Sequence, residues 1–257
     1  MPQQLNIALI QSSLHWENPE ANRKMFEKKI KSIPSEVDMV VLPEMFSTGF
    51  TMTPQNLSPL DGMATVEWMQ NMAKEKNAAM VGSIVFQDDN KNYNRLFFVH
   101  PHGEVEHYDK RHTFTLAGED AVYESGVDKV VLDYKGFRIC PLICYDLRFP
   151  VWSRNVQNYD ALIYVANWPT PRIAAWDTLL KARAIENMAY CIGVNRVGLD
   201  ELGYDYPGHS AVYDALGNTM AYSEKEEILY VVLDKEHVEG TRSKLKFLED
   251  RDNFSLI

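Results

Sequence analysis

The feature that most constrains the fold is the alternation of short apolar runs with helical segments in the first third of the chain. Residues 5–11, 37–43 and 79–86 are apolar runs of strand length. After the first run, Asn18 and Pro19 predict a helix over residues 18–33, because asparagine caps helix N-termini and proline fits the first helical position. Before the third run, Val66, Met69 and Met72 recur at helical spacing. Alternating strands and helices predict a layered α/β fold.

The centre and the end of the chain change to hairpins. Residues 93–100 and 105–109 are strand-like and are joined by a turn composition at 101–104, and residues 130–134 and 137–143 flank Lys135-Gly136. The pattern then predicts a helix beginning near Leu147, a strand at 161–166, a long helix at 174–188 and a strand near 191–195. Residues 210–214 and 228–233 are predicted to form a closing hairpin, with Gly217-Asn218 in its turn.

Length and composition are those of a folded protein with a large core. The chain has 257 residues, of which 46% are hydrophobic. Layered α/β folds of this length form one domain, so residues 1–257 are predicted to be a single domain. The tail, residues 236–257, is charged and has two interpretations that the sequence leaves open. It is either a solvated C-terminal arm or an arm that wraps onto a second subunit.

Charge and hydropathy exclude several classes of partner. The formal net charge is −10, and no cluster of consecutive lysines and arginines occurs. Nucleic acid and anionic membrane surfaces are therefore not expected as partners. No apolar run reaches the roughly 18–20 residues that span a bilayer, and the first residues lack the pattern of a signal peptide. The expected location is the cytoplasm.

Three polar residues follow strand-like apolar runs and could meet in space. Glu44 comes after the run at 37–43, Lys110 after the strand at 105–109 and Cys144 after the strand at 137–143. Open α/β sheets place ligands beyond the carboxyl ends of their strands, so these side chains can converge. Taken singly, each also has an ordinary interpretation as a turn cap, a solvated hairpin residue or a small buried hydrophobe.

As a group, the three residue types suit acyl transfer. A free thiol has a pKa of about 8.5, so only a few per cent is thiolate at pH 7, and it needs a base or a cation. Glu44 can accept the thiol proton. The ammonium of Lys110 can stabilise both the thiolate and the oxyanion that forms when sulfur attacks a carbonyl. Cys140, four positions before Cys144, is predicted to pack in the core.

The motifs around these residues resemble those of the nitrilase (carbon-nitrogen hydrolase) superfamily. They are LPEMF at 42–46, DKRH at 109–112 and ICYDLRFP at 143–150, and NRVG at 195–198 and GHS at 208–210 also match family segments. The similarity extends over essentially the whole chain. It implies a four-layer αββα sandwich of the nitrilase type and a carbon-nitrogen hydrolase that needs no metal or organic cofactor. It also implies a homodimer or larger homo-oligomer, with the helix after Cys144 and the charged tail as interface elements.

The resemblance assigns catalytic roles. Cys144 is the expected nucleophile, Glu44 the general base and Lys110 the cation that stabilises the oxyanion. The backbone N–H of Tyr145 would be a second oxyanion donor. Attack on an amide would release ammonia and leave a thioester, which water then hydrolyses.

Many members of the superfamily carry a second glutamate shortly after the lysine. Glu119 matches this residue best, and Glu124 is the competing candidate. Ser125-Gly126 stands where the family usually has Pro-Gly, which loosens the local alignment. If Glu119 is the match, the resemblance implies that it holds the lysine and the substrate nitrogen in place.

The sequence constrains the identity of the substrate less than it constrains the catalytic residues. The segment CYDLRFP at 144–150 resembles omega-amidases, which hydrolyse the terminal amide of small dicarboxylic acid monoamides such as 2-oxoglutaramate and succinamate. Arg148 would face the same side of a helix as Cys144 and could bind a substrate carboxylate, or else form a structural salt bridge. The pocket walls would come from four aromatic residues, which core or interface positions would suit equally: Phe46, Trp168, Tyr204 and Tyr206. Nitriles and N-carbamoyl compounds are the alternative substrates.

Other functional classes have less support in the sequence. The histidines at 100, 102, 107 and 112 lack a metal-ligand spacing and are predicted to be solvated hairpin residues, so no metal site is expected. The chain contains no sequence motif of serine hydrolases, dinucleotide or nucleotide binding, or zinc proteases. A non-catalytic binding protein of the same fold is disfavoured, because glutamate, lysine and cysteine are all present.

Overall fold

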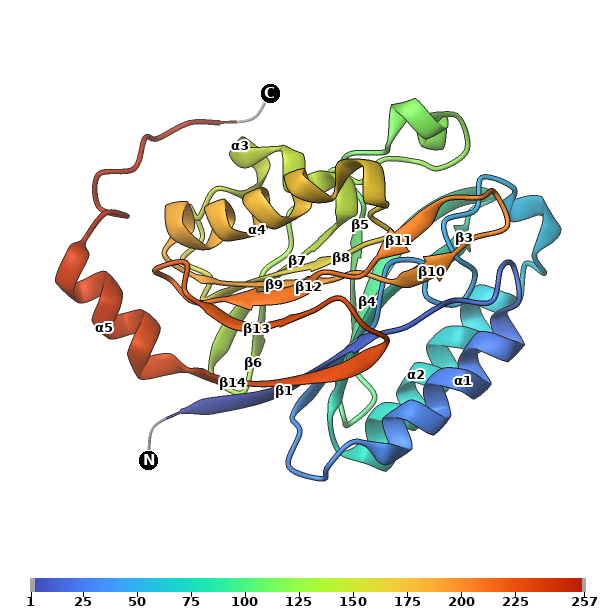
Figure 1. The fold of residues 1–257 in the computed structure, drawn as a ribbon, viewed down its shortest axis with the longest axis horizontal. Coiled ribbons are helices and arrows are strands. Elements are labelled where there is room, and N and C mark those ends of the chain that lie inside the picture. The colour runs from blue at the N-terminus through green and yellow to red at the C-terminus, as the bar shows by residue number, and fades with distance from the viewer. Residues whose placement is uncertain (1–2, 256–257) are drawn as a thin grey trace.

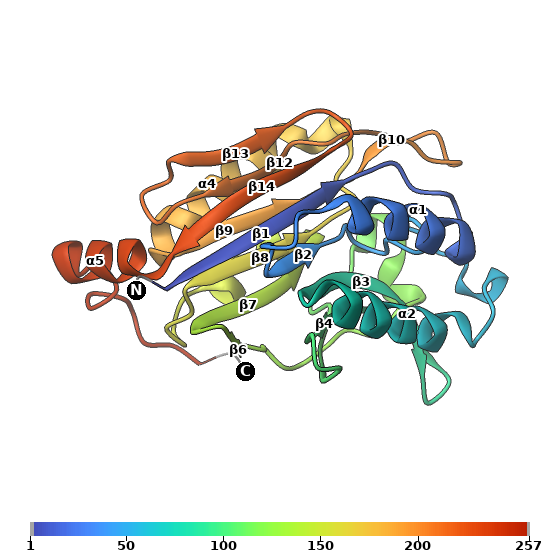
Figure 2. The same cartoon turned by 90° about the horizontal axis from the view of Figure 1, so that it is seen from below.

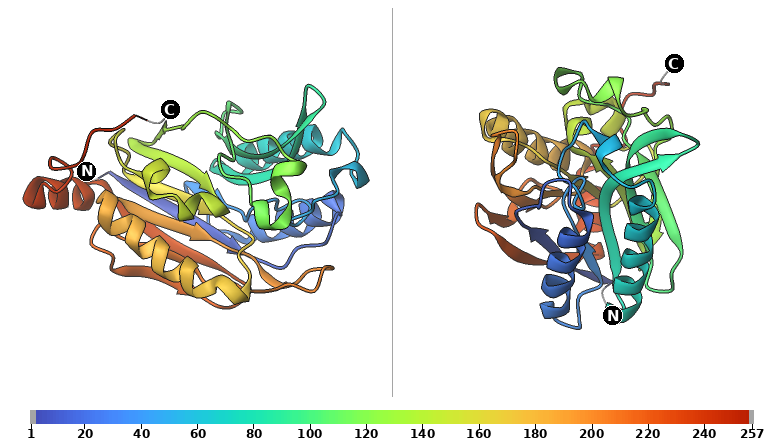
Figure 3. Two further views of the ribbon diagram at one scale, coloured as in Figure 1. Left: turned by 90° about the horizontal axis from the view of Figure 1, so that it is seen from above. Right: turned by 90° about the vertical axis from the view of Figure 1, so that its right-hand side faces the viewer.

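Two six-stranded sheets lie face to face in the computed structural model, which describes residues 3–255 (Figure 1). The strand order is β14-β1-β2-β3-β4-β5 in the first sheet and β13-β12-β9-β8-β7-β6 in the second. Helices α1 and α2 lie side by side on the outer face of the first sheet (Figure 2), and α4 runs along the outer face of the second (Figure 3). This arrangement confirms the predicted αββα sandwich.

The strands are short to medium in length. In the first sheet they are β14 (Glu227–Asp234), β1 (Gln4–Gln11), β2 (Met39–Val41), β3 (Ala79–Asp88), β4 (Lys91–Val99) and β5 (Val105–Asp109). In the second they are β13 (Thr219–Ser223), β12 (Ser210–Tyr213), β9 (Tyr190–Val194), β8 (Ala161–Val165), β7 (Phe137–Ile143) and β6 (Leu132–Tyr134). A separate two-stranded ribbon consists of β10 (Val197–Leu199) and β11 (Asp205–Pro207).

The helices are few, and short 3-10 turns connect several strands. The α-helices are α1 (Pro19–Ser32), α2 (Asp61–Lys76), α3 (Pro150–Ser153), α4 (Ile173–Asn187) and α5 (Lys235–Leu245). The 3-10 turns are η1 (Pro54–Asn56), η2 (Thr115–Ala117), η3 (Glu119–Ala121), η4 (Cys144–Arg148) and η5 (Thr170–Arg172).

The N-cap of α1 and the apolar residues of β2 show how the sequence determines the helical and sheet layers. Asn18 caps α1, since its side chain accepts a hydrogen bond from the N–H of Ala21 at 3.1 Å, as the sequence predicts. In β2, Met39 and Val41 belong to the core shared by both sheets, whereas Val40 packs in the core beneath α1 and α2. Successive strand residues point to opposite faces, so a strand buried on both faces is apolar throughout.

The predicted closing hairpin is wrong in its pairing. The turn at Gly217-Asn218 does close a hairpin, but between β12 and β13. β14 instead crosses to the first sheet and pairs antiparallel with β1 along its full length, from Gln4 opposite Asp234 to Gln11 opposite Glu227 (Figure 2). β13 could not be recognised as a strand from the sequence, because it is largely exposed and has no continuous apolar pattern. The next strand-like segment after the turn was therefore β14.

The predicted helix near Leu147 is also shorter than expected. Cys144–Arg148 forms a 3-10 turn, and α3 adds only four residues after it. Pro150 explains the break, because a proline disfavours helical backbone at the residue before it, and Phe149 is accordingly non-helical with φ −112° and ψ 88°.

The charged tail begins with α5, which packs on the chain's own second sheet. Val238 is fully buried, and the guanidinium of Arg242 donates to the backbone oxygens of Met188 and Tyr159 at 2.8 and 2.6 Å. The segment after α5 is irregular up to the last described residues. A contact between this arm and a second subunit stays a prediction.

Candidate active site

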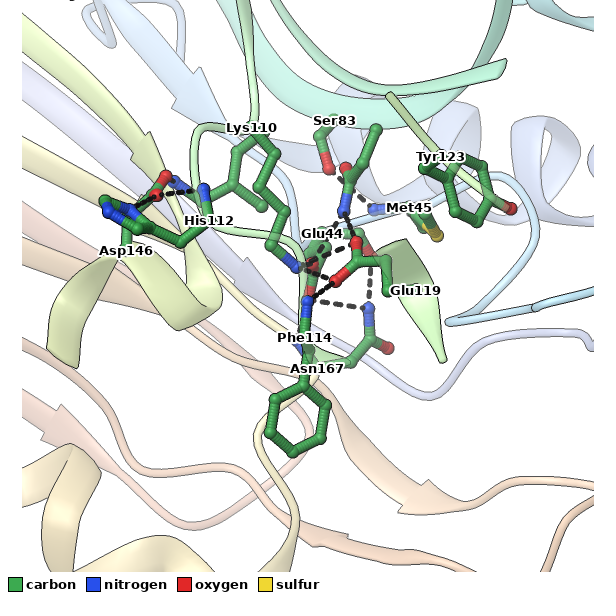
Figure 4. A network of polar contacts seen from close by, with 12 residues as sticks. Glu44, Met45, Ser83, Lys110, His112, Phe114, Glu119, Tyr123, Asp146 and Asn167 are labelled. Carbon is green, nitrogen blue, oxygen red and sulfur yellow. Dashed lines mark hydrogen bonds and ion pairs between the residues drawn. The ribbon is translucent and has the colours of Figure 1, made fainter. Parts of the chain in front are cut away.

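The carboxyl ends of three strands from the two sheets bring the predicted catalytic residues together. Glu44 follows β2, Lys110 follows β5 and Cys144 follows β7. The ammonium of Lys110 donates to Glu44 Oε1 at 2.8 Å, and both side chains are fully buried (Figure 4). The Cys144 thiol lies close enough to both charges for each to shift its pKa.

Lys110 is shared between two carboxylates. Its ammonium also donates to Glu119 Oε1 at 2.9 Å and to Oε2 at 2.8 Å (Figure 4). The carboxylate of Glu119 accepts a further hydrogen bond, at 2.6 Å, from the backbone N–H of Phe114. Glu124, the competing candidate, lies at the surface and pairs with Lys91 at 3.5 Å. The geometry thus places Glu119 beside Lys110.

Burial and the paired charges set the protonation states of this cluster. Burial by itself would lower the pKa of Lys110, but the attraction of Glu119 and Glu44 outweighs it and the pKa is raised, so the lysine stays charged. The pKa of Glu119 is raised, chiefly by burial, although Lys110 opposes the shift. Burial, followed by the charge of Glu44, raises the pKa of the Cys144 thiol well above its ordinary value. The Cys144 thiol is therefore neutral at rest.

Two buried asparagines orient the glutamates, and the sequence analysis missed both. The side-chain amide of Asn94 donates to Glu44 Oε1 at 2.8 Å and to Glu119 Oε1 at 3.1 Å. The backbone N–H of Asn167 donates to Glu44 Oε2 at 2.8 Å, and its side chain donates to the Glu44 carbonyl at 2.7 Å. The available signal was a polar residue inside or just after an apolar strand, since Asn94 lies within β4 and Asn167 follows β8.

The backbone at Cys144 is strained. Cys144 has φ 43°, in the left-handed region that residues with a Cβ rarely adopt. Such a conformation persists only where its surroundings enforce it. Asp146 provides much of that enforcement, because its carboxylate accepts hydrogen bonds from the N–H groups of Ile143 and His112, both at 3.0 Å, and from the Tyr108 hydroxyl at 2.8 Å.

A cavity of about 320 Å³ opens beside the sulfur. Cys144, Tyr145 and Arg148 line it, as do Trp168, Tyr204 and Tyr206. Phe46 does not line it, contrary to the expectation from the sequence. Its ring is fully buried in the core under α1 and α2, at 5.5 Å from the ring of Phe26. The left-handed backbone of Met45, φ 43°, separates its direction from that of Glu44.

Arg148 faces the cavity without a carboxylate partner among residues 3–255. Its guanidinium carbon instead lies 4.9 Å from the centre of the Trp168 ring. The salt-bridge interpretation of Arg148 therefore has no support in the described structure. Although the turn after Cys144 is 3-10 rather than α-helical, it still brings Arg148 to the same cavity as the sulfur.

Three of the four histidines that were predicted to be solvated, His100, His102 and His112, form local pairs with carboxylates, and His100 is buried rather than solvated. His100 contacts Glu106 at 2.9 Å, and His112 contacts Asp146 at 2.8 Å while its ring stacks on Phe149. Within the described residues, no group of three or more histidine, cysteine or acidic side chains could hold a metal ion. None of the helices in that part of the chain has the length and apolar character needed to cross a membrane.

Comparison with known proteins gives a consistent result. The sequence pattern of carbon-nitrogen hydrolases matches residues 6–243. The chain is 41% identical to the omega-amidase YafV of Yersinia enterocolitica, covering 98% of this chain and 99% of that protein. It is 29% identical to the 2-oxoglutaramate amidase of Bacillus subtilis, covering 95% of this chain and 96% of that protein. A solved structure from Xanthomonas campestris, a CN-hydrolase superfamily protein with an arsenic adduct in its active site, is 36% identical, with a TM-score of 0.95 and 99% of each chain covered.

The chain therefore belongs to the carbon-nitrogen hydrolase family, which confirms the resemblance seen in its motifs. It is an amide-hydrolysing enzyme of the omega-amidase-like group.

Proposed function

We propose that this enzyme hydrolyses the terminal amide of small dicarboxylic acid monoamides of the 2-oxoglutaramate or succinamate type and releases ammonia. The observation that carries the proposal is Arg148, whose guanidinium faces the same cavity as the Cys144 sulfur and has no carboxylate partner among the described residues. A guanidinium binds a carboxylate through paired hydrogen bonds. The names of the related omega-amidase and 2-oxoglutaramate amidase support the same substrate class.

The first half of the reaction forms a thioester. Glu44 takes the proton of the Cys144 thiol as the sulfur attacks the amide carbonyl. Lys110 and the backbone N–H of Tyr145 stabilise the negative charge on the carbonyl oxygen. Glu44 then gives its proton to the leaving nitrogen, the carbon–nitrogen bond breaks, and ammonia departs.

The second half regenerates the thiol. Glu44 accepts a proton from a water molecule whose oxygen attacks the thioester, and the same proton returns to the sulfur when the carbon–sulfur bond breaks. Glu119 acts as a positioning residue, since it holds Lys110 through both carboxylate oxygens. The products are the free thiol and a dicarboxylic acid, whose new carboxyl group loses its proton to solvent, so protons and atoms balance without a cofactor.

An ammonia-release screen tests the substrate class. The panel contains succinamate and 2-oxoglutaramate, neutral amides of similar length, nitriles and N-carbamoyl compounds. We expect the highest kcat/KM for the omega-amides with a distal carboxylate. A higher kcat/KM for nitriles or N-carbamoyl compounds would support the alternative, because the same Glu-Lys-Cys arrangement serves all three classes.

Replacement of the nucleophile tests the chemistry. Cys144→Ala should abolish ammonia release from succinamate and leave the fold intact, as checked by circular dichroism and thermal unfolding. Cys140→Ala is the matched control, because Cys140 is also a buried free cysteine but does not line the cavity. Activity retained in Cys144→Ala, or lost in both variants alike, would remove the nucleophile assignment.

A further inference from the structure

Arg172 is a second arginine at the cavity, and the sequence analysis assigned it no role. It ends η5 and stands directly before α4. Like Arg148 it lines the cavity that contains Cys144, and among the described residues it forms no ion pair with a carboxylate.

Helix stability does not explain an arginine at this position. Arg172 is the N-cap residue of α4, a 15-residue helix that has no side-chain cap hydrogen bond and no acidic residue in its first turn. The N-terminus of a helix carries partial positive charge, so a cation there is locally unfavourable. When a residue breaks such helix preferences and also lines a cavity, a functional reason for that residue is indicated.

Both arginines rest on aromatic rings that belong to the catalytic framework. The guanidinium carbon of Arg172 lies 5.1 Å from the centre of the Phe114 ring, and that of Arg148 lies 4.9 Å from the Trp168 ring. The backbone N–H of Phe114 donates to Glu119, and its ring points away from the carboxylates (Figure 4). Trp168 follows the Glu44 partner Asn167, and its indole N–H donates to the Arg172 carbonyl at 2.8 Å. The two cations are thus fixed relative to the reacting groups.

The charge balance of the cavity favours an anionic ligand. Asp200 is the carboxylate among its described lining residues, and its oxygens are already occupied. They accept the Tyr206 hydroxyl at 2.9 Å and the backbone N–H groups of Leu202 and Tyr204, also at 2.9 Å. Two guanidinium groups without protein carboxylates repel each other, and a bound carboxylate relieves that repulsion while it accepts hydrogen bonds from both.

We infer that Arg172 is a specificity-determining residue that binds the distal carboxylate of the substrate together with Arg148. The inference rests on the proposed function, since it concerns how that substrate class is held. A carboxylate offers about four acceptor positions on its two oxygens, enough for two guanidinium groups approaching from different segments. The guanidinium carbons of Arg148 and Arg172 lie over the rings of Trp168 and Phe114. A guanidinium can interact with an aromatic face and still donate from its N–H edge to a ligand.

The test is steady-state kinetics of Arg172→Met on succinamate and on butanamide, a neutral amide with the same number of carbons. Hydrogen bonds to charged groups are worth enough to change binding by about tenfold to a hundredfold. We expect KM for succinamate to rise by about that factor, with kcat/KM for butanamide changed by less than about threefold. Arg172→Lys should recover part of the loss. Lys24→Met, at a side chain of α1 that is 69% exposed, is the control for loss of one positive charge.

A second readout does not depend on turnover of the amide. Succinate, which carries carboxylates but no amide, should inhibit the wild type competitively, and its inhibition constant should rise by about the same factor in Arg172→Met. Equal losses on succinamate and butanamide, or an unchanged succinate inhibition constant, would overturn the inference while leaving the proposed function in place. A wild type that shows no preference for succinamate over butanamide would instead overturn the proposed function.

Discussion

Lys110 sets the electrostatics of the catalytic cluster because one ammonium compensates two buried carboxylates, Glu44 and Glu119. The cluster is left with one excess negative charge when both are ionised. That excess, together with burial, raises the pKa of the adjacent Cys144 thiol. It also makes the cluster a good acceptor for one proton, so the thiol proton can move to Glu44 as the sulfur attacks.

Removal of the ammonium should affect both activity and stability. Lys110→Ala is expected to lower kcat/KM by at least ~100-fold, because an oxyanion donor is lost. It should also lower the free energy of unfolding by about 3–5 kcal/mol, because two carboxylates are left buried without a cation. Ammonia release and urea unfolding measure the two effects.

A double variant separates the two contributions. In Lys110→Ala/Glu119→Gln one of the carboxylates is neutral, so most of the lost stability should return while activity stays low. Recovery of activity along with stability would mean that Lys110 acts only through the fold and would contradict its role at the oxyanion.

The general base is tested by a substitution of equal size. Glu44→Gln keeps the shape of the side chain but cannot accept the thiol proton, so kcat should fall by at least ~100-fold. Glu124→Gln is the control, since that carboxylate lies at the surface and pairs with Lys91. A loss below tenfold in Glu44→Gln would be inconsistent with proton transfer through this residue.

At the scale of elements, the site depends on a connection between the loop after β5 and the turn after β7. Asp146 makes this connection, because it accepts from Tyr108 and His112 on one side and from the Ile143 N–H on the other. All three donors lie within 3.0 Å of its oxygens. The loop that carries Lys110 and the turn that carries Cys144 are thereby held in one fixed relation.

Asp146→Asn tests this connection. An amide has one acceptor oxygen where the carboxylate has two, and its NH₂ group would face N–H and O–H donors. Leaving buried donors unsatisfied costs about 1–3 kcal/mol each, so we expect the free energy of unfolding to fall by about 2–4 kcal/mol and kcat to fall with it. Asp133→Asn is the matched control, because the Asp133 side chain is 81% exposed and should change stability by less than about 0.5 kcal/mol.

The sequence predicts the elements that have a strong local signal. The cap at Asn18 and the turn at 101–104 define α1 and the β4–β5 hairpin, and both are present. The strand-like segments that become β2, β5 and β7 end just before Glu44, Lys110 and Cys144, which is why the three predicted catalytic positions could be placed at strand ends.

The sequence fails where a partner distant in the chain decides the structure. β14 pairs with β1 because the other sheet offers a free edge, and nothing local to residues 227–234 encodes that choice. Asn94 donates hydrogen bonds to two glutamates only because the fold brings β4 next to both of them. Phe46 follows Glu44 by two positions, yet the left-handed backbone of Met45 between them, φ 43°, turns its ring into the core.

At the scale of the whole molecule, α3 and the charged tail share one surface. Pro150 and Val151 of α3 line a shallow hollow together with Asp250 and Phe254 of the tail. Val151 is 51% exposed and Phe254 is 42% exposed. The two elements that the family resemblance implies for a subunit interface are therefore adjacent, with apolar side chains open to solvent on both.

We expect a homodimer that uses this surface, and light scattering after gel filtration measures its mass. Val151→Glu should shift the protein to the monomer mass, because it places a charge in an apolar contact. Val127→Glu, at an exposed valine outside this hollow, should leave the mass unchanged. Because α3 directly follows the turn that carries Cys144 and Arg148, dissociation should also lower kcat/KM. A dimer mass that persists in Val151→Glu would place the interface elsewhere on the molecule.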